Sequence, residues 1–338
     1  MRQLHPLKIS KINQLTDDAV ELIFDVPENL ISEFKFTAGQ YITICCSIDD
    51  EDIRRAYSLC SDSNSGEIAV GVKRIEGGKM SSFLTQDVKV GDILNVMPPN
   101  GSFCLEDEKN IVGICAGSGI TPILSMIKST SSQFTLVYGN KTQNSSMFQE
   151  ELLNMSITTY YTYSRENVEG CFNSRIDKNL LSELSENELF LKADGYYICG
   201  PGEMIDDVEE FLLDRGVDKN KIKFERFIAS KNKKDSESIE IEQEIISNIT
   251  VIIDGDEFEY QLPSKGESIL DSAMNEGADV PFSCKGGVCC TCKAKVMEGQ
   301  AVMTENYALS EDEVAEGFIL TCKSHPDSEN IVVDFDEI

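Results

Sequence analysis

The stretch that decides the C-terminal fold is Ser283-Cys284-Lys285-Gly286-Gly287-Val288-Cys289-Cys290-Thr291-Cys292. Its cysteines follow the pattern C-x4-C-x2-C, and a further cysteine, Cys322, follows after 29 residues. Three thiols on one short loop can face a common centre, and the adjacent glycines let backbone N–H groups approach it because no Cβ stands in the way. The pattern therefore predicts that four thiols, those of Cys284, Cys289, Cys292 and Cys322, bind one metal centre.

This spacing resembles that of the plant-type ferredoxins, whose cysteines hold a [2Fe-2S] cluster. The resemblance implies a C-terminal β-grasp ferredoxin domain, which we expect over residues 247–338. Cys290 lies between two ligands but at neither expected position, so we interpret it as a packed thiol, with ligation as the alternative. The chain has only two histidines, His5 and His325, which excludes a histidine-rich metal site and gives no sign of a hydrolytic triad.

Length and charge limit the other possibilities. A chain of 338 residues is expected to form two or three domains rather than one core. It has 30 Lys and Arg against 59 Asp and Glu, a formal net charge of −29, so nucleic acid and anionic membranes are poor partners. Residues 247–338 alone carry 19 acidic and 5 basic side chains, which predicts either a basic protein partner or only a well-solvated surface.

The sequence also predicts a cytoplasmic protein that does not insert into a membrane. Residues 1–7 lack the apolar core of a signal peptide. The longest uncharged run, residues 110–127, is broken by glycines and by Pro122, so we expect a strand, a turn and a buried helix there. In a reducing compartment the twelve cysteines should be free thiols or ligands.

Two domains are expected before the cysteine loop. Residues 1–103 contain short alternating strands and frequent turns, which predict a small antiparallel β-barrel. Residues 104–230 alternate apolar strands with helical stretches, which predicts parallel βαβ units of a Rossmann-like α/β domain. The charged stretch from about residue 229, nearly free of apolar side chains, predicts a linker, which we assign to 231–246, before an apolar strand at 249–253.

Two motifs in the first segment resemble the flavin-binding motifs of the ferredoxin–NADP reductase superfamily. They are R-x-Y-S in Arg55-Ala56-Tyr57-Ser58 and G-x-x-S in Gly78-Lys79-Met80-Ser81. The resemblance implies that Arg55 and Ser81 hold flavin phosphate. It also implies that Tyr57 packs on the ring and that Ser58 faces its N5 edge, and a flat Tyr face and a planar Arg fork suit these roles. The segment looks like the FAD type, with FMN as the alternative.

The second segment carries matching nucleotide motifs. Ala116-Gly117-Ser118-Gly119-Ile120-Thr121-Pro122 follows a strand and opens a helix, for which we expect Thr121 as N-cap and Pro122 as the first helical residue. A glycine turn there offers free N–H groups to a pyrophosphate, which makes Gly117, Gly119 and Thr121 candidate binding residues. Cys199-Gly200-Pro201 follows a second strand, and in the superfamily this cysteine lies beside the nicotinamide.

The resemblance extends to three further positions. It places Glu225 in the catalytic group with Ser58 and Cys199, and it makes Phe227 the aromatic that covers the flavin where nicotinamide enters. A core Phe at a strand end is the alternative for Phe227. Ser164-Arg165 resembles the site for the 2′-phosphate of NADPH, to which Arg175 could add charge; NADH is the alternative coenzyme.

The order of barrel, nucleotide domain and ferredoxin domain is similar to that of the oxygenase reductases. This family includes the reductase subunit of phenylacetyl-CoA epoxidase and reductases of steroid and aromatic-ring oxygenases. The resemblance implies electron transfer from NADPH to FAD, to the [2Fe-2S] cluster, and then to a terminal oxygenase. Two alternatives remain: a general NAD(P)H reductase with other soluble acceptors, and an iron–sulfur redox sensor.

Overall fold

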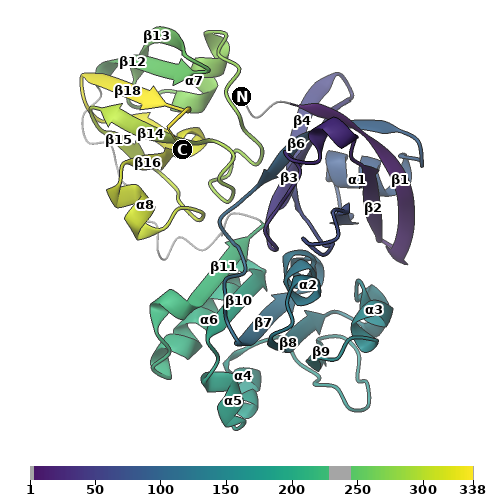
Figure 1. Cartoon of the computed structure of the whole chain (residues 1–338). Coiled ribbons are helices and arrows are strands. Elements are labelled where there is room, and N and C mark those ends of the chain that lie inside the picture. Colours follow the sequence, from purple (N-terminus) through teal and green to yellow (C-terminus); the bar gives the residue numbers. More distant parts are fainter. Residues whose placement is uncertain (1–3, 228–244, 338) are drawn as a thin grey trace. The chain divides into compact units, whose positions relative to one another are not determined.

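The computed structural model describes residues 4–227 and 245–337, which belong to two compact units (Figure 1). The first unit runs from Leu4 to Phe227. The second contains the described residues 245–337. Within the described ranges, no helix is both long and apolar enough to span a membrane.

The first half of the Leu4–Phe227 unit is an antiparallel barrel of order β4-β3-β6-β1-β2-β5. Its strands are β1 (His5–Thr16), β2 (Ala19–Asp25), β3 (Tyr41–Ile48), β4 (Glu51–Ser58), β5 (Ile68–Lys73) and β6 (Ile93–Asn100). The two edge strands meet because Leu59, just after β4, forms an antiparallel bridge with Val70 of β5. Alternate apolar side chains such as Leu22 and Ile42 are fully buried inside. A helix of eight residues, α1 (Lys79–Gln86), follows β5.

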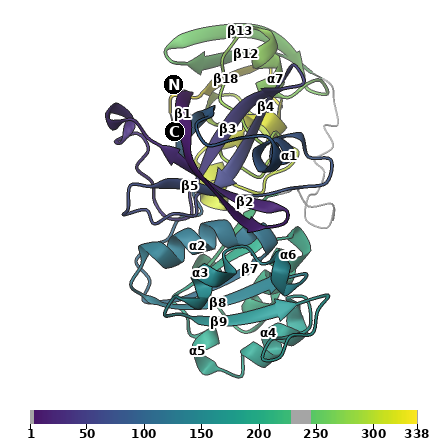
Figure 2. The same ribbon diagram turned by 90° about the vertical axis from the view of Figure 1, so that its right-hand side faces the viewer.

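The second half is a parallel sheet of order β11-β10-β7-β8-β9. Its strands are β7 (Asn110–Ala116), β8 (Gln133–Asn140), β9 (Thr158–Tyr163), β10 (Gly195–Gly200) and β11 (Ile222–Arg226). The helices are α2 (Ile120–Ser129), α3 (Gln149–Leu153), α4 (Lys178–Leu184), α5 (Glu188–Leu191) and α6 (Gly202–Asp214). In Figure 2, α2 and α3 lie on one face of the sheet and α4 and α5 on the other. The strand order reverses between β7 and β10, the position where open α/β sheets bind ligands.

Barrel and sheet share one hydrophobic core. Ala69 of the barrel belongs to the same buried cluster as Ile123 of α2. Gly71 of β5 is required for this approach, because a Cβ at Gly71 would lie 2.6 Å from Cγ2 of Thr121. The flavin-type barrel and the nucleotide-type sheet are therefore held in direct contact.

The second unit contains a mixed sheet of order β13-β12-β18-β14-β16. The helices and strands of the whole unit are β12 (Ile246–Ile253), β13 (Asp256–Pro263), α7 (Ile269–Asn275), β14 (Lys293–Glu298), β15 (Ala301–Met303), α8 (Glu311–Ala315), β16 (Phe318–Leu320), β17 (Ser324–Pro326) and β18 (Asn330–Asp334). The strand predicted at 249–253 is part of β12, which begins at Ile246. Most of the linker predicted at 231–246 lies outside the described residues.

Candidate functional site

Three predicted catalytic residues meet where the barrel contacts the parallel sheet. Ser58 ends β4, Cys199 lies in β10, and Glu225 lies in β11 directly opposite Cys199. The Ser58 hydroxyl donates a hydrogen bond to Oε2 of Glu225, with 3.2 Å between the oxygens. Residues 167 positions apart in the chain thus join the two domains at one point.

The local environment disfavours charge on these groups. Burial raises the pKa of Glu225 to about 8, and the hydrogen bond from Ser58 only partly opposes this effect. Burial also raises the pKa of the Cys199 thiol well above its ordinary value, as does the neighbouring Glu225. Glu225 therefore holds a proton near neutral pH, and Cys199 is a neutral thiol rather than a nucleophile.

Cys104, which no sequence motif indicated, is a neighbour of this group. Burial raises its pKa to about 11, and the charge of Glu225 contributes to the increase. Phe227, two residues beyond Glu225, is 37% exposed. The alternative of a core Phe is therefore wrong, and the ring is accessible to a ligand.

The two flavin motifs lie on neighbouring elements. An ion pair of 2.8 Å between Nζ of Lys79 and Oε2 of Glu51 ties the start of α1 to the start of β4. The Ser81 hydroxyl accepts from the backbone N–H of Ile75 and so closes the turn before α1.

Not every side chain in the second flavin motif is available to a ligand. The Lys79 ammonium is engaged by Glu51, and Met80 is buried in the barrel core. The start of α1 also has backbone N–H groups without partners in the helix, and such groups can bind a phosphate. Arg55 lies on β4 with its guanidinium exposed, and Nη1 donates to the carbonyl of Arg54 at 2.7 Å.

The glycine turn after β7 approaches the end of β10 closely. A Cβ at Gly119 would lie 2.1 Å from the carbonyl oxygen of Cys199, so only glycine fits. Gly117 has a φ of +57°, in the left-handed region. At the end of β10, a Cβ at Gly200 would lie 2.7 Å from Cε of Met204, and Pro201 is the N-cap of α6.

The prediction that Thr121 caps this helix was wrong. A 3-10 turn, Gly117–Gly119, leads directly into α2, whose N-cap is Gly119. The Thr121 hydroxyl instead donates to the carbonyl of Ser118 at 3.0 Å, as expected for a residue already within the helix. Pro122 is correspondingly the third helical residue.

Backbone hydrogen bonds connect the segments that follow β8 and β9, which contain the basic residues Lys141 and Arg165. The backbone N–H of Arg165 donates to the carbonyl of Lys141 at 2.9 Å, and that of Ser164 donates to the carbonyl of Asn140 at 3.0 Å. Arg175 is exposed, and Thr162 of β9 donates to the carbonyl of the preceding Ser174 at 2.6 Å. The predicted phosphate-binding residues therefore share one edge of the sheet.

In the second unit, the four predicted ligands form two sulfur pairs. The thiol of Cys289 donates to Sγ of Cys284 at 3.1 Å, and this bond, with backbone N–H groups including that of Gly286, lowers the pKa of Cys284 to about 6. A hydrogen bond from Cys292 likewise lowers the pKa of Cys322. Thiolates with several N–H donors suit an iron–sulfur cluster, so the donor set fits one.

Cys290, predicted as a packed thiol, lies among buried side chains. It is buried, and its Sγ donates to the carbonyl of Ala308 at 3.5 Å. This thiol belongs to the hydrophobic core of the second unit.

Three domain families match the chain in the same order as these sites. They are described as oxidoreductase FAD-binding domain, over residues 6–105, oxidoreductase NAD-binding domain, over 114–210, and 2Fe-2S iron-sulfur cluster binding domain, over 251–327. The chain is also 38% identical to a subunit of the 1,2-phenylacetyl-CoA epoxidase of Escherichia coli (strain K12), with 99% of each chain covered. The chain belongs to the ferredoxin–NADP reductase superfamily.

The chain is also similar to a further curated protein and, in its fold, to a solved structure. The chain is 29% identical to the ferredoxin reductase component of 3-ketosteroid-9-alpha-monooxygenase of Rhodococcus rhodochrous, over 97% of this chain and 96% of the relative. Its fold matches that of phthalate dioxygenase reductase with a TM-score of 0.62 at 23% identity, over 98% of each chain. The protein is thus an oxidoreductase with an FAD domain, an NAD(P) domain and a [2Fe-2S] domain.

The structure adds a residue of this reductase that the sequence analysis did not identify. Asn140 ends β8 beside Ser164; among the described residues its buried Nδ2 makes no hydrogen bond of good geometry, although the side chain lies close enough to the Tyr138 hydroxyl to lower the pKa of that phenol. An unsatisfied buried amide costs free energy unless a ligand or water pairs with it. Its place at the carboxyl end of a parallel strand, visible in the sequence as Gly139-Asn140-Lys141, was the available signal.

Proposed function

We propose that this reductase takes electrons from NADPH and passes them through FAD and the [2Fe-2S] cluster to a terminal oxygenase. The observation that carries the proposal is the Ser58–Glu225 hydrogen bond beside Cys199, because it joins the flavin barrel to the nucleotide domain at one reaction site. The four-cysteine loop on the same chain provides the outlet. The names of the relatives, which are reductase components or subunits of oxygenases, support the partner class.

The bound flavin and cluster supply the conversion of one hydride, a two-electron carrier, into single electrons. The chain positions the reactants. The glycine turn at Gly117 and Gly119 would hold the coenzyme pyrophosphate, and Phe227 would cover the flavin ring where nicotinamide enters. Ser58 and Glu225 provide a polar, hydrogen-bonded wall, and Cys199 fills the space beside the nicotinamide without reacting.

We also propose NADPH as the coenzyme and the cytoplasm as the compartment. Arg165 and Arg175 at the edge formed by β8 and β9 suit the additional phosphate of NADPH, because Arg binds phosphate with paired donors. All twelve cysteines are free thiols, which is typical of a reducing compartment.

An anaerobic titration with NADPH and with NADH tests this function. We expect NADPH to bleach the flavin and cluster absorbance rapidly, and an added acceptor protein to restore it. A redox sensor would be reduced slowly and would not turn over. Rapid turnover with soluble dyes but none with any oxygenase component would favour the general reductase.

The partner proposal predicts an electrostatic docking step, and the structure indicates which acidic side chains can be changed without disturbing the fold. Glu313 caps α8 with Ser310 and forms an ion pair with Lys293 at 3.3 Å, so reversing its charge would disturb the fold. Asp312 on α8 and Glu316, the C-cap of α8, are both exposed, and the apolar Val314 between them in the chain is exposed as well. From Glu316 the chain continues through β16 to the predicted ligand Cys322. Asp312 and Glu316 are therefore better candidates than Glu313 for a docking contact near the cluster.

Replacing both Asp312 with Asn and Glu316 with Gln should slow electron transfer to a basic oxygenase and flatten its dependence on salt. Steering by charge changes association about ten- to a thousandfold and is screened over about 8 Å at physiological salt. Stopped-flow transfer rates between about 0.05 and 0.5 M salt, chosen to span about a threefold change in screening length, provide the measurement.

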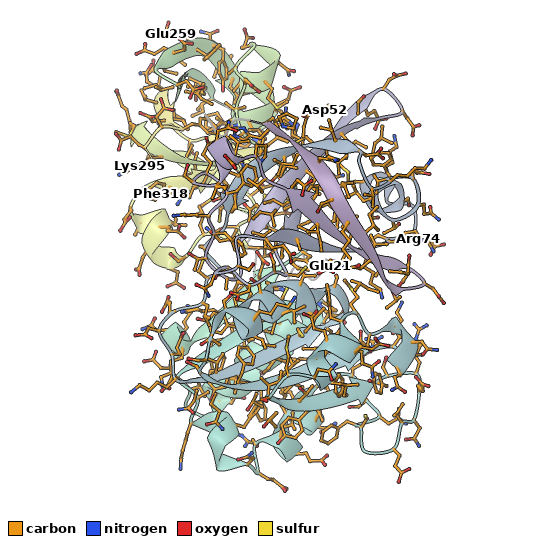
Figure 3. All side chains as sticks on the ribbon, turned by 45° about the vertical axis from the view of Figure 1, so that its right-hand side comes forward. Glu21, Asp52, Arg74, Glu259, Lys295 and Phe318 are labelled. Carbon is orange, nitrogen blue, oxygen red and sulfur yellow. The ribbon has the colours of Figure 1, made fainter. Side chains whose placement is uncertain are left out.

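The matched control changes Glu257 and Glu259 of the exposed strand β13 to Gln, and Figure 3 shows Glu259 on this unit. Dye reduction should stay unchanged in both variants. If the control lowers the salt dependence as much as the α8 variant, the acids act only through the overall charge.

A further inference from the structure

The few basic residues of the second unit are not randomly placed. Three of the five lysines in residues 247–338 directly follow predicted cluster ligands: Lys285, Lys293 and Lys323. Each forms an ion pair, with Asp271 at 2.7 Å, Glu313 at 3.3 Å and Glu305 at 2.9 Å, respectively. In a region with 19 acidic side chains, this places positive charge next to the cluster loop.

The side chain of Lys323 packs directly against the cluster loop. A Cβ at Gly287, between the first two ligands, would lie 3.3 Å from Cγ of Lys323 and 3.0 Å from the carbonyl oxygen of Glu305. The side chain of Lys323 and the backbone of its ion-pair partner therefore both pack against the loop. The backbone N–H of Tyr307 donates to the carbonyl of Gly287 at 2.9 Å, which holds this segment in place.

Lys285 belongs to the same group of charges. Its ammonium binds Asp271 of α7, whose position is fixed by a hydrogen bond from Ser268. Burial raises the pKa of Asp271, but the hydrogen bonds from Lys285 and Ser268 and the charge of Lys323 hold it below its ordinary value. Both lysines thus act on one carboxylate.

Lys293 is oriented differently although it also follows a ligand. Its Nζ lies 4.6 Å from the centroid of the Phe318 ring, and Nζ of Lys295 lies 5.4 Å from the same centroid. Figure 3 labels Lys295 and Phe318. Ala294 between them is fully buried, so the two lysines share the opposite face of β14. Although Lys293 directly follows the predicted ligand Cys292 in sequence, its ammonium lies at the Phe318 ring and not at the cluster loop.

We propose that Lys323 and Lys285, opposed by Glu305 and Asp271, set the reduction potential of the [2Fe-2S] cluster. The reduced cluster carries one more negative charge than the oxidised cluster, so an adjacent ammonium stabilises the reduced form and an adjacent carboxylate destabilises it. Net charge around the sulfurs is a recognised determinant of the potential in such clusters. This inference rests on the cluster assignment in the proposed function.

The test is a redox titration of the full-length holoprotein, followed by cluster absorbance and by the electron paramagnetic resonance signal of the reduced cluster. Lys323→Gln should lower the midpoint potential, and Glu305→Gln should raise it. For each unit charge we expect roughly a three- to tenfold change in the reduction equilibrium, where tenfold corresponds to about 59 mV for a one-electron couple. Lys285→Gln and Asp271→Asn should shift the potential in the same two directions.

Two controls separate charge from structure. Lys295→Gln removes the same charge on the Phe318 face and should change the potential much less. The double variant Lys323→Gln with Glu305→Gln should return close to the wild-type potential. Shifts of the same sign for the Lys323 and Glu305 variants, or shifts no larger than that of Lys295→Gln, would overturn the inference. A wild-type protein without iron or a resonance signal would instead overturn the cluster assignment and this inference together.

Discussion

Replacing Cys322 with serine is expected to abolish the [2Fe-2S] cluster while reduction of the flavin by NADPH persists. Cys284, Cys289 and Cys292 should behave alike, because each supplies one of four thiolates and a serine hydroxyl is a far poorer ligand for iron. The flavin and nucleotide motifs lie in the Leu4–Phe227 unit and all four ligands lie in the other. Iron content, cluster absorbance and NADPH-dependent dye reduction provide the measurements.

Cys290 supplies the matched control, since it adjoins two ligands but packs against Ala308. Cys290→Ser should retain the full iron content. Loss of iron on changing Cys290, with retention on changing Cys289, would overturn the ligand assignment. Alanine variants of the same ligands exclude the possibility that serine oxygen partly replaces the thiolate.

Replacing Arg165 with alanine should weaken the binding of NADPH about ten- to a hundredfold and leave the binding of NADH nearly unchanged. Only NADPH offers the additional phosphate, and a charge-assisted hydrogen bond contributes roughly 1.5 to 3 kcal/mol. The backbone of Arg165 is held by its hydrogen bond to Lys141, which the substitution preserves. Kd and KM for both coenzymes provide the measurement.

Two further variants sharpen the Arg165 experiment. Arg165→Lys keeps the charge but loses the planar fork, so it should show an intermediate loss. Arg175→Ala should also weaken the binding of NADPH, but by a smaller factor. If Arg165→Ala weakens the binding of NADPH and of NADH equally, Arg165 has a structural role. NADH would then be as suitable a coenzyme as NADPH.

The sequence by itself determined the features that depend on short contiguous motifs. The cysteine spacing, the two flavin motifs and the glycine turn after β7 predicted the superfamily and its FAD, NAD(P) and [2Fe-2S] domains, because each motif, apart from the distant Cys322, consists of residues close together in the chain. The barrel and the parallel βαβ region were also predictable, since hydrophobic periodicity is a local signal.

Only the tertiary structure decided which distant residues meet. The Ser58–Glu225 hydrogen bond forms only because the barrel packs against the parallel sheet. Neither the R-x-Y-S motif that contains Ser58 nor the sequence around Glu225 indicates that the two residues are in contact. The same holds for the Lys79 ammonium, which binds Glu51, and for Glu313, which binds Lys293. The Thr121 cap was mispredicted because the backbone turn, and not the side chain, starts α2. Strand register and side-chain packing fix these contacts, and both depend on the whole fold.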